Sequence, residues 1–383
     1  MSPVRVVVVG GGVIGLLTAM ECVRAGARVD LVDQADIPSP SATSYDRHRV
    51  IRALHRGSAS LTRAAARADG YWQEVERRVG TRFYHRVGAL TAMPVEDVPA
   101  NIDLLAGAGA AARALTPEEL STRYPRIRFP DGLAGVVEAA AGAVLADRAL
   151  AALARWLRGQ PTLYAHPHCR VVSVEEAGVV RLADGTVLAG DRVVVAAGPW
   201  SRDLLPAALS GDLTLYRQSM LSYAPTPSRE AWVGMPAIPA LGTAGGAWLM
   251  PPVADTPARL SAASACRAVP EMTDRVTSDR WRDHLVDQFR ALLVDFDPAA
   301  VVGAADGYYL ADTASEAPLL ATFGDAGIWA YAACGGMSFK FAPLVARTVA
   351  DGVLGRRPRP TGLDWLDRPR EFADRPGSRG RTS

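Results

Sequence analysis

The stretch that decides the fold of this 383-residue chain is residues 4–33, VRVVVVGGGVIGLLTAMECVRAGARVDLVD. The β-branched run at residues 4–9 predicts a buried parallel strand. Residues 16–25 predict a helix that ends at Gly26, and residues 29–32 predict a second strand. Together these elements form a βαβ unit of about 30 residues, the opening unit of an α/β fold.

Between the first strand and the helix lies the glycine-rich turn GGGVIG, residues 10–15. In such a turn Gly10 permits the tight bend, Gly12 lets the backbone approach a pyrophosphate, and Gly15 allows the helix to pack closely on the strand. The helix N-terminus would then receive the phosphates. Asp33 suits an acceptor for ribose hydroxyls and would repel a 2′-phosphate, which argues against NADP. The motif alone leaves FAD and NAD open.

Further along the chain, apolar strands are predicted at residues 192–197 and 327–333, and they resemble the first strand in composition. Residues 213–265 alternate in short runs broken by proline and glycine, which predicts an antiparallel sheet. Helices with amphipathic spacing are predicted at residues 61–79, 145–156, 279–294 and 342–354. We therefore expect a nucleotide-binding domain made of separated segments, with a β-sheet domain inserted into it.

Composition excludes several classes of protein. Hydrophobic residues make up 49% and charged residues 21%, and the net charge is +2, so neither disorder nor a nucleic-acid surface is expected. No apolar run approaches the 20 residues of a membrane helix, so no membrane partner is expected. The four cysteines are scattered, which argues against a metal site and a disulfide framework and favours a cytoplasmic location.

The basic residues are almost all arginines. Of the 42 lysine and arginine residues, one is a lysine, Lys340, and the rest are arginines. Because the two side chains differ in shape, hydration and donor geometry, a single retained lysine marks a position where a guanidinium does not serve; chance is the alternative explanation.

Four stretches resemble those of a known family, the D-amino-acid-oxidase-like FAD-dependent oxidoreductases, and among them the sarcosine oxidase branch most closely. They occur in the family's order and span nearly the whole chain: residues 6–33; Arg49-Val50-Ile51-Arg52, followed by RVGAL at 86–90; VVVAAGPW at 193–200, followed by Tyr216-Arg217-Gln218; and GGMSFKF at 335–341.

The resemblance implies an α/β fold (α+β overall), with a discontinuous Rossmann-like FAD-binding domain and an inserted antiparallel β-sheet substrate domain. The expected FAD-binding segments are 1–85, 140–212 and 300–365, the substrate segments are 86–139 and 213–299, and a basic tail occupies 366–383. The flavin ring would lie between the two domains.

The resemblance also implies roles for individual residues. Arg49 would reach the flavin ring, and Arg52 and Lys340 would hold a substrate carboxylate by charge-assisted hydrogen bonds. The expected FAD contacts are Gly10, Gly12, Val13, Ile14, Gly15, Asp33, Gln34, Ser41, Arg49, Val171, Ala197, Gly198, Trp200, Asp306, Gly335, Gly336, Met337, Ser338, Phe339 and Lys340. The expected substrate pocket comprises Tyr216, Trp248, Ala263, Tyr308 and Met337.

Three departures from the branch matter. Asp306 occupies the place of the cysteine that holds FAD covalently, so dissociable FAD is expected, with Cys334 as an alternative tether. Arg259 aligns with the lysine associated with oxygen activation, so the electron acceptor is either O2 or another molecule. Trp248, Ala263 and Met337 replace polar pocket residues, which favours a bulkier or aromatic amino acid over sarcosine; simple core roles for Trp248 and Met337 are the alternative.

The expected reaction is therefore oxidation of the C–N bond of an amino acid or secondary amine that carries a carboxylate, by hydride transfer to flavin N5 to give an imine. Two alternatives remain at this point. One is an FAD-dependent hydroxylase or monooxygenase with the same two-domain layout, and the other is a catalytically silent flavoprotein subunit.

Overall fold

The computed structural model describes residues 3–225, 232–241, 246–324 and 327–356. The expected basic tail at 366–383 and the last residues of the expected FAD-binding segment 300–365 lie outside these ranges.

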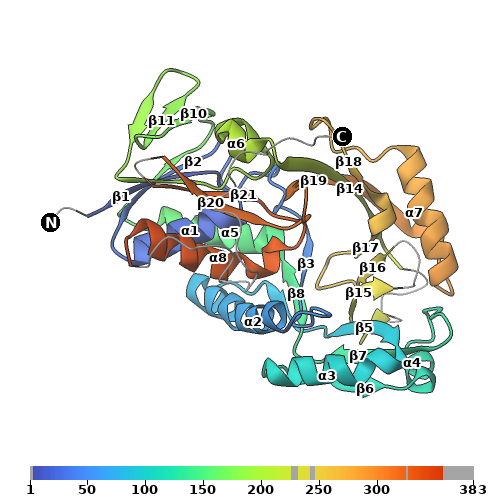
Figure 1. The fold of residues 1–383 in the computed structure, drawn as a ribbon. Helices are drawn as coiled ribbons and strands as arrows, with labels where there is room; N and C mark the ends of the chain where they lie inside the picture. Colours follow the sequence, from blue (N-terminus) through green and yellow to red (C-terminus); the bar gives the residue numbers. More distant parts are fainter. Residues whose placement is uncertain (1–2, 226–231, 242–245, 325–326, 357–383) are drawn as a thin grey trace, which may run out of the picture.

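A six-stranded sheet surrounds the strand that precedes the glycine-rich turn (Figure 1). Its order is β20 (Leu319–Phe323), β21 (Ile328–Ala333), β13 (Arg192–Val195), β1 (Arg5–Val9), β2 (Arg28–Val32) and β9 (Leu163–His166). All neighbours are parallel except β20 and β21. Strands distant in the sequence therefore lie side by side, which confirms the expected discontinuous parallel domain.

The valines of β1 explain why this strand is central. Val6 and Val8 pack with the helices on one face, while Val7 and Val9 pack with a smaller sheet on the other. Those helices are α1 (Val13–Arg24), α5 (Ala146–Arg158) and α8 (Ser338–Val353), and the smaller sheet is β10 (Val171–Glu175), β11 (Val179–Leu182) and β12 (Val187–Ala189). A strand covered on both faces needs apolar residues at consecutive positions.

Two helices begin earlier than their apolar spacing predicted. Helix α1 begins at Val13 rather than at residue 16, with Gly12 as its N-cap. Helix α8 begins at Ser338 rather than at 342 and contains Pro343 in its interior. The turn of helix that precedes Pro343 is held by packing: the Trp72 indole donates to the Lys340 carbonyl (3.0 Å) and stacks on Phe339.

The second large element is a nine-stranded sheet. Its order is β18 (Cys266–Ala268), β14 (Leu213–Tyr223), β17 (Ala258–Ala262), β16 (Ala247–Met250), β15 (Ala237–Leu241), β5 (Ala89–Pro94), β7 (Leu133–Glu138) and β6 (Arg113–Leu115), with β19 (Val301–Asp312) paired to β14. The sheet is antiparallel as expected, except where β15 meets β5 in parallel. That parallel junction joins the two separate segments of the expected substrate domain.

Strand β19 differs from the expected domain boundary at residue 300. It pairs with β14 from Val301 to Asp312, so residues 301–312 belong to the large sheet by hydrogen bonding, although the sequence placed them with the FAD-binding segments. Only from β20 onward does the chain return to the six-stranded sheet.

The remaining elements cover the two sheets. A three-stranded sheet of β3 (His48–Ile51), β8 (Gly142–Leu145) and β4 (Tyr84–His85) lies between them in Figure 1. The other helices are α2 (Ala59–Val79), α3 (Val98–Gly107), α4 (Pro117–Arg123), α6 (Ala207–Ser210) and α7 (Asp279–Leu292). Helix α2 ends at Gly80 in a left-handed conformation, and α4 starts with a capping box of Thr116 and Glu119.

Candidate active site

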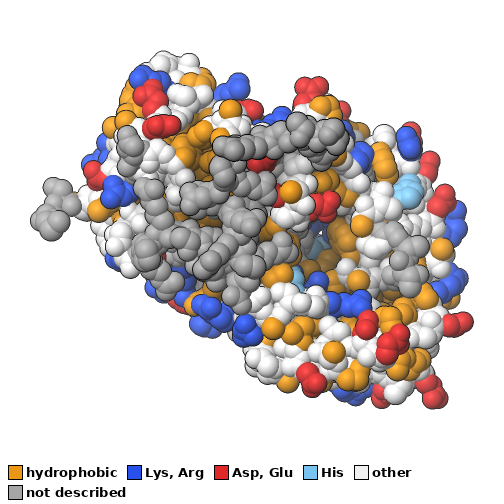
Figure 2. Space-filling view, in the orientation of Figure 1, with side chains coloured by type: hydrophobic (Ala, Val, Ile, Leu, Met, Phe, Trp, Pro, Cys, Tyr) orange, Lys and Arg blue, Asp and Glu red, His pale blue; other side chains and the backbone are white. Residues whose placement is uncertain are grey.

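A cavity of about 860 Å³ lies between the two large sheets, and the surface in Figure 2 is hollowed there. Its walls come from the ends of β1, β13 and β21, from β3, and from β14 to β17 and β19 of the large sheet. Among the residues expected in the site, the following line it: Gly10, Gly12, Val13, Ile14, Asp33, Gln34, Ser41, Arg49, Arg52, Val171, Ala197, Gly198, Trp200, Trp248, Arg259, Asp306, Gly336, Met337, Ser338, Phe339 and Lys340.

The glycine-rich turn lines the cavity, and its geometry fits a dinucleotide. Gly10 has φ +108, and a Cβ there would lie 2.4 Å from the Ala196 carbonyl oxygen. A Cβ at Gly15 would lie 1.8 Å from the Gly10 oxygen, so the helix packs directly on the turn. The N-cap of helix α1 is Gly12, which has no side chain, and the first turn has no acidic residue. The Val13 amide donates to the Ser44 hydroxyl (3.1 Å), and the positive end of the helix dipole suits a phosphate.

Asp33 stands at the end of β2, beside this turn. Its carboxylate accepts hydrogen bonds from the amides of Gly11 (2.7 Å) and Ala35 (2.9 Å). Burial raises the pKa of Asp33, against the opposing effect of these amides. Each carboxylate oxygen can accept more than one hydrogen bond, so Asp33 both shapes the turn and retains capacity for a ribose hydroxyl.

Two basic side chains without a carboxylate partner also line the cavity. Arg52 follows β3, and Lys340 lies in the first turn of α8. Among the described residues neither side chain forms an ion pair, and Arg52 Nε is buried without a hydrogen-bond partner. Burial and then the neighbouring Arg52 lower the pKa of Lys340 well below its usual range, against the opposing effect of Glu138. Two basic side chains without a carboxylate partner in one cavity form a site for an anion.

Glu138, at the end of β7, sits beside these cations without bonding to them. Its carboxylate oxygens accept from the backbone amides of Ala53 (2.6 Å) and Leu54 (3.2 Å). Burial raises the pKa of Glu138, while the two amides, Arg52 and Lys340 lower it. The carboxylate therefore holds the backbone that follows Arg52 and leaves the cations free to bind a ligand.

Apolar side chains of the large sheet also line the cavity. They are Met220 on β14 with Trp248 and Met250 on β16, and Met337 before α8 adds to them. Ile238 and Leu249 line the cavity as well, but their side chains pack in the core on the other face of the sheet. A ligand that places an anion on Arg52 and Lys340 would thus contact apolar surface with its remaining part.

Three expected pocket residues are not brought to the cavity. Tyr308 points the other way on β19, where its hydroxyl donates to the Asp274 carbonyl (2.9 Å). Its neighbour Tyr309 lines the cavity instead, because adjacent side chains of a strand point to opposite faces. Tyr216 stacks behind Tyr309 (ring centroids 5.3 Å apart), and Ala263 lies exposed in a short 3-10 helix.

Gly15 and Gly335 also lie outside the cavity lining and act through the backbone. A Cβ at Gly335, which has φ +56, would meet the backbone of residues 316–318 at 2.7–2.9 Å. Gly335 thereby lets the turn before α8 pass close to the segment that precedes β20.

Asp306, at the place of the family's covalent cysteine, is part of a salt-bridge network. Its carboxylate bonds Arg217, Arg267 (3.0 Å) and the Thr277 hydroxyl (2.7 Å). Cys334 lines the cavity from the turn before α8, and burial raises the pKa of its thiol. A buried thiol of raised pKa is a poor nucleophile.

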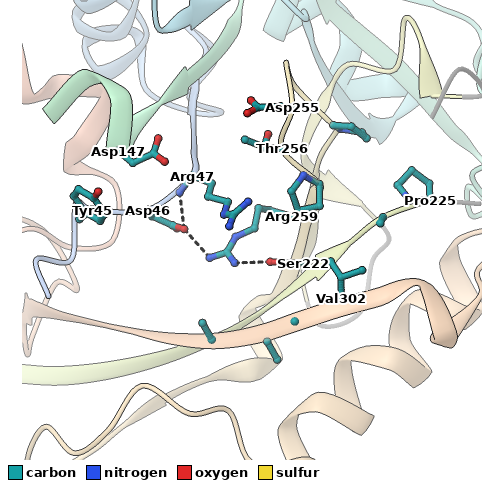
Figure 3. A pocket seen from close by; sticks show the side chains of 16 residues that line it. Tyr45, Asp46, Arg47, Asp147, Ser222, Pro225, Asp255, Thr256, Arg259 and Val302 are labelled. Carbon is teal, nitrogen blue, oxygen red and sulfur yellow. Dashed lines mark hydrogen bonds and ion pairs between the residues drawn. The ribbon is translucent and has the colours of Figure 1, made fainter. Parts of the chain in front are cut away.

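Arg259 stands between this cavity and a second one of about 720 Å³ (Figure 3). Its guanidinium donates to Asp46 (2.8 Å) and to Ser222 (3.2 Å). Burial alone would raise the pKa of Asp46, but Arg49 and then Arg259 lower it to about 2. The two cavities share Tyr45, Asp46, Arg259 and Ala305, so one layer of side chains separates them.

Among the cavity residues that sequence reasoning missed are His55, His48 and Tyr309. His55 Nε2 lies 3.2 Å from Lys340 Nζ, across 285 positions of sequence. His48 Nε2 contacts the Thr256 hydroxyl, and burial lowers the pKa of His48 to about 3 despite the opposing effect of Asp46. Both histidines lie in the basic segment around Arg49 and Arg52, whose pattern does not distinguish cavity residues from surface ones.

Two further properties follow from the described residues. None of their helices combines the length and the hydrophobicity that crossing a bilayer requires. No group of three or more His, Cys, Asp or Glu residues is placed to hold a metal ion in those ranges.

Comparisons with known proteins agree with this geometry. Residues 5–352 match the family model described as FAD dependent oxidoreductase. Human peroxisomal sarcosine oxidase is 26% identical over 205 residues, and Pseudomonas putida glycine oxidase is 31% identical over 215 residues. Each match covers 52% of this chain and 51% or 57% of the relative, so the chain spans about half the length of the curated relatives it matches.

Among solved structures, the open form of NikD, an unusual amino acid oxidase essential for nikkomycin biosynthesis, has a TM-score of 0.78 at 21% identity, covering 96% of this chain and 97% of that one. L-proline dehydrogenase from P. horikoshii has a TM-score of 0.77 at 19% identity, covering 96% and 97%. At these identities the likeness concerns the fold, and it matches the expected α/β class.

Proposed function

We propose that this chain, which belongs to the family of FAD-dependent oxidoreductases, oxidises the C–N bond of an amino acid or secondary amine that carries a carboxylate. The observation that carries the proposal is one cavity lined by two different kinds of group. The glycine-rich turn and Asp33 form a dinucleotide cradle, and Arg52 with Lys340 forms an anion site.

The residues divide the work accordingly. The N-terminus of α1 and Asp33 would hold the pyrophosphate and ribose of FAD, and the uncapped first turn of α8 would direct amides toward the ring. When bound, FAD would supply the two-electron acceptor for the substrate. Arg52 and Lys340 would bind the substrate carboxylate and fix its orientation, which is the positioning part of catalysis.

The apolar wall of Met220, Trp248 and Met250 supports a substrate with a bulky or aromatic side chain. Sarcosine and glycine, the substrates named for the two relatives, have no side chain to bury against such a wall. The proposal therefore places the side chain of the substrate against Trp248 and its carboxylate on Arg52 and Lys340.

The manner of FAD binding and the electron acceptor also belong to the proposal. Non-covalent FAD is supported by Asp306, whose carboxylate is engaged by two arginines and cannot form a thioether. An acceptor other than O2 is supported by Arg259, whose charge is neutralised by Asp46. A cytoplasmic location is supported by four free cysteines.

The test is an anaerobic screen of amino acids and their N-methyl derivatives, read as bleaching of the flavin band. We expect bleaching by aromatic or large apolar amino acids, and a K340M variant should lose it at least about tenfold in rate per unit concentration. Acid precipitation of the same sample should leave the yellow colour in solution. Protein without a flavin band, or K340M that bleaches as fast as the parent with every carboxylate substrate, would refute the proposal.

A further inference from the structure

We propose that Lys340 accepts the proton of the substrate's ammonium group and that His55 positions Lys340 for this transfer. The inference rests on the proposed function and goes beyond it, because there Lys340 only binds the carboxylate. It gives the same side chain two tasks in sequence, first as a base and then as a cation.

The geometry of Lys340 is unusual for a lysine. The residue is 8% exposed, and its Nζ lies 3.2 Å from Nε2 of His55, which is also 8% exposed. Among the described residues Lys340 forms no ion pair with a carboxylate. The nearby Glu138 directs its oxygens to the amides of Ala53 and Leu54. The hydrogen-bond partner of the lysine is therefore an imidazole.

The groups that face Lys340 from the surrounding elements favour its neutral form when the cavity is empty. Arg52, after β3, is a fixed positive charge, and Glu138, at the end of β7, is a partly compensating negative charge. His55 and the Phe341 ring complete the surroundings. Burial and Arg52 together lower the pKa of Lys340 well below the usual range. Neutral lysine has a lone pair on Nζ and can accept a proton.

An imidazole suits both states of this lysine. When Lys340 is neutral, either nitrogen of the pair can donate the hydrogen bond across 3.2 Å. When Lys340 becomes an ammonium, it has only donors, and Nε2 of a neutral His55 accepts one of them. Two positive charges at this distance would repel each other strongly, so the pair binds one extra proton and His55 orients the ammonium that results.

An amino acid enters such a site as a zwitterion. Its ammonium and carboxylate are one carbon apart, so a side chain that bonds the carboxylate reaches the ammonium directly or through one water. One N–H bond of the substrate ammonium breaks, and one N–H bond at Lys340 Nζ forms. No electron is transferred and no other reactant is needed. The substrate is left as a neutral amine with its lone pair, and the new lysine ammonium pairs with the carboxylate.

This role explains why the chain has one lysine. Arginine is used at all the other basic positions, and arginine would bind the carboxylate at least as well through its planar donor fork. A guanidinium does not release its proton in proteins, so it cannot act as a base. Among the lysine and arginine positions, position 340 therefore holds the one side chain that can release its proton.

The experiment measures protons, using the flavin-loaded protein. Acetate and 3-phenylpropanoate, which have a carboxylate and no amine, are titrated by calorimetry at about pH 8 in buffers of different ionisation enthalpy. We expect uptake of about one proton per bound carboxylate, because the anion charges Lys340. Their Kd should rise about tenfold per pH unit above the pKa of free Lys340.

The K340R variant distinguishes the role of Lys340 as a base from its role as a cation. K340R should bind 3-phenylpropanoate with no proton uptake and with a Kd independent of pH. With amino acids it should bleach the flavin slowly at neutral pH and recover as the pH approaches the pKa of the free amine.

H55F should weaken 3-phenylpropanoate binding about tenfold by removing an acceptor of a charged donor, and H55Q should restore most of it. H284F, which changes a histidine that contacts Ser264 and lies outside the cavity lining, should change nothing.

The possible failures are distinct. If the parent protein binds the carboxylates without proton uptake, or if K340R takes up as many protons as the parent, the inference is wrong while the proposed function stands. If neither acetate nor 3-phenylpropanoate binds and no amino acid bleaches the flavin, the proposed function fails, and this inference fails with it. Equal proton uptake and affinity in H55F and the parent would remove His55 from the proposal.

Discussion

Two arginines line the same cavity in different electrostatic states. Arg259, on β17, bonds Asp46 and Ser222, and Asp46 also bonds Arg49. Arg52, after β3, has no ion pair among the described residues, and Lys340 beside it has none either. Both guanidinium groups have a buried Nε without a partner. The difference lies in the carboxylate: the protein supplies one to Arg259 and leaves Arg52 to a ligand.

The difference indicates which charge serves the fold and which serves binding. An ion pair in a buried position is strongly destabilising when one partner is removed, because the other charge is left uncompensated. A cation that is already uncompensated contributes little to stability and offers strong bonds to an incoming anion. Removing the carboxylate of Asp46 should therefore change the free energy of unfolding. Removing the guanidinium of Arg52 should change the affinity for a carboxylate ligand.

The largest effect is expected from D46N. This change leaves Arg259 and Arg49 without their shared carboxylate, which should cost about 3 kcal/mol of unfolding free energy, read as a lower midpoint in thermal or urea unfolding. D147N is the matched control, because Asp147 accepts only the amide of Arg148 and should change little. Equal midpoints for D46N and D147N would show that the Arg259 pair does not support the fold.

R52M and R259M should have opposite effects: one should change ligand affinity and the other should change stability. R52M removes a charge-assisted bond to the carboxylate, so the affinity for 3-phenylpropanoate should fall by about 10- to 100-fold, with the unfolding midpoint kept. R259M should lower the midpoint and leave this affinity within a few-fold. Flavin perturbation titrations and thermal unfolding of the two variants decide the matter. An affinity lost equally in both variants would contradict the division between the two arginines.

The smallest expected effect is the loss of the stability contributed by Asp46 at acidic pH. The folded-state pKa of Asp46, about 2, lies below its ordinary value because of Arg49 and Arg259. A lowered pKa contributes stability above the unfolded pKa, and this stability is lost as the pH falls from about 4 to about 2. The contribution is about 2 kcal/mol. The difference in stability between the parent and D46N should shrink over this range, and a difference that stays constant down to pH about 2 would contradict the assignment.

Local patterns in the sequence predicted the strand, the glycine-rich turn and the helix that follows it. The valines of β1, the glycines of the turn and Asp33 act within about 30 residues, so their spacing reflects their geometry. The resemblance to a family predicted that Arg52 and Lys340 act together, and in the structure both line the cavity and Arg52 lowers the pKa of Lys340. Tyr308 shows the limit of such carry-over, because a shift of one residue on a strand turns a side chain to the other face.

The sequence by itself determined the βαβ unit, the mixed fold and the single lysine, because these depend on composition and on short-range periodicity. Only the tertiary structure decided the partners of the buried charges. His55 meets Lys340 across 285 positions, and Asp46 meets Arg259 across 213. The proton affinity and the free charge of a buried group depend on its neighbours in space and on its distance from water. Those neighbours come from strands and helices that only the folded chain places together.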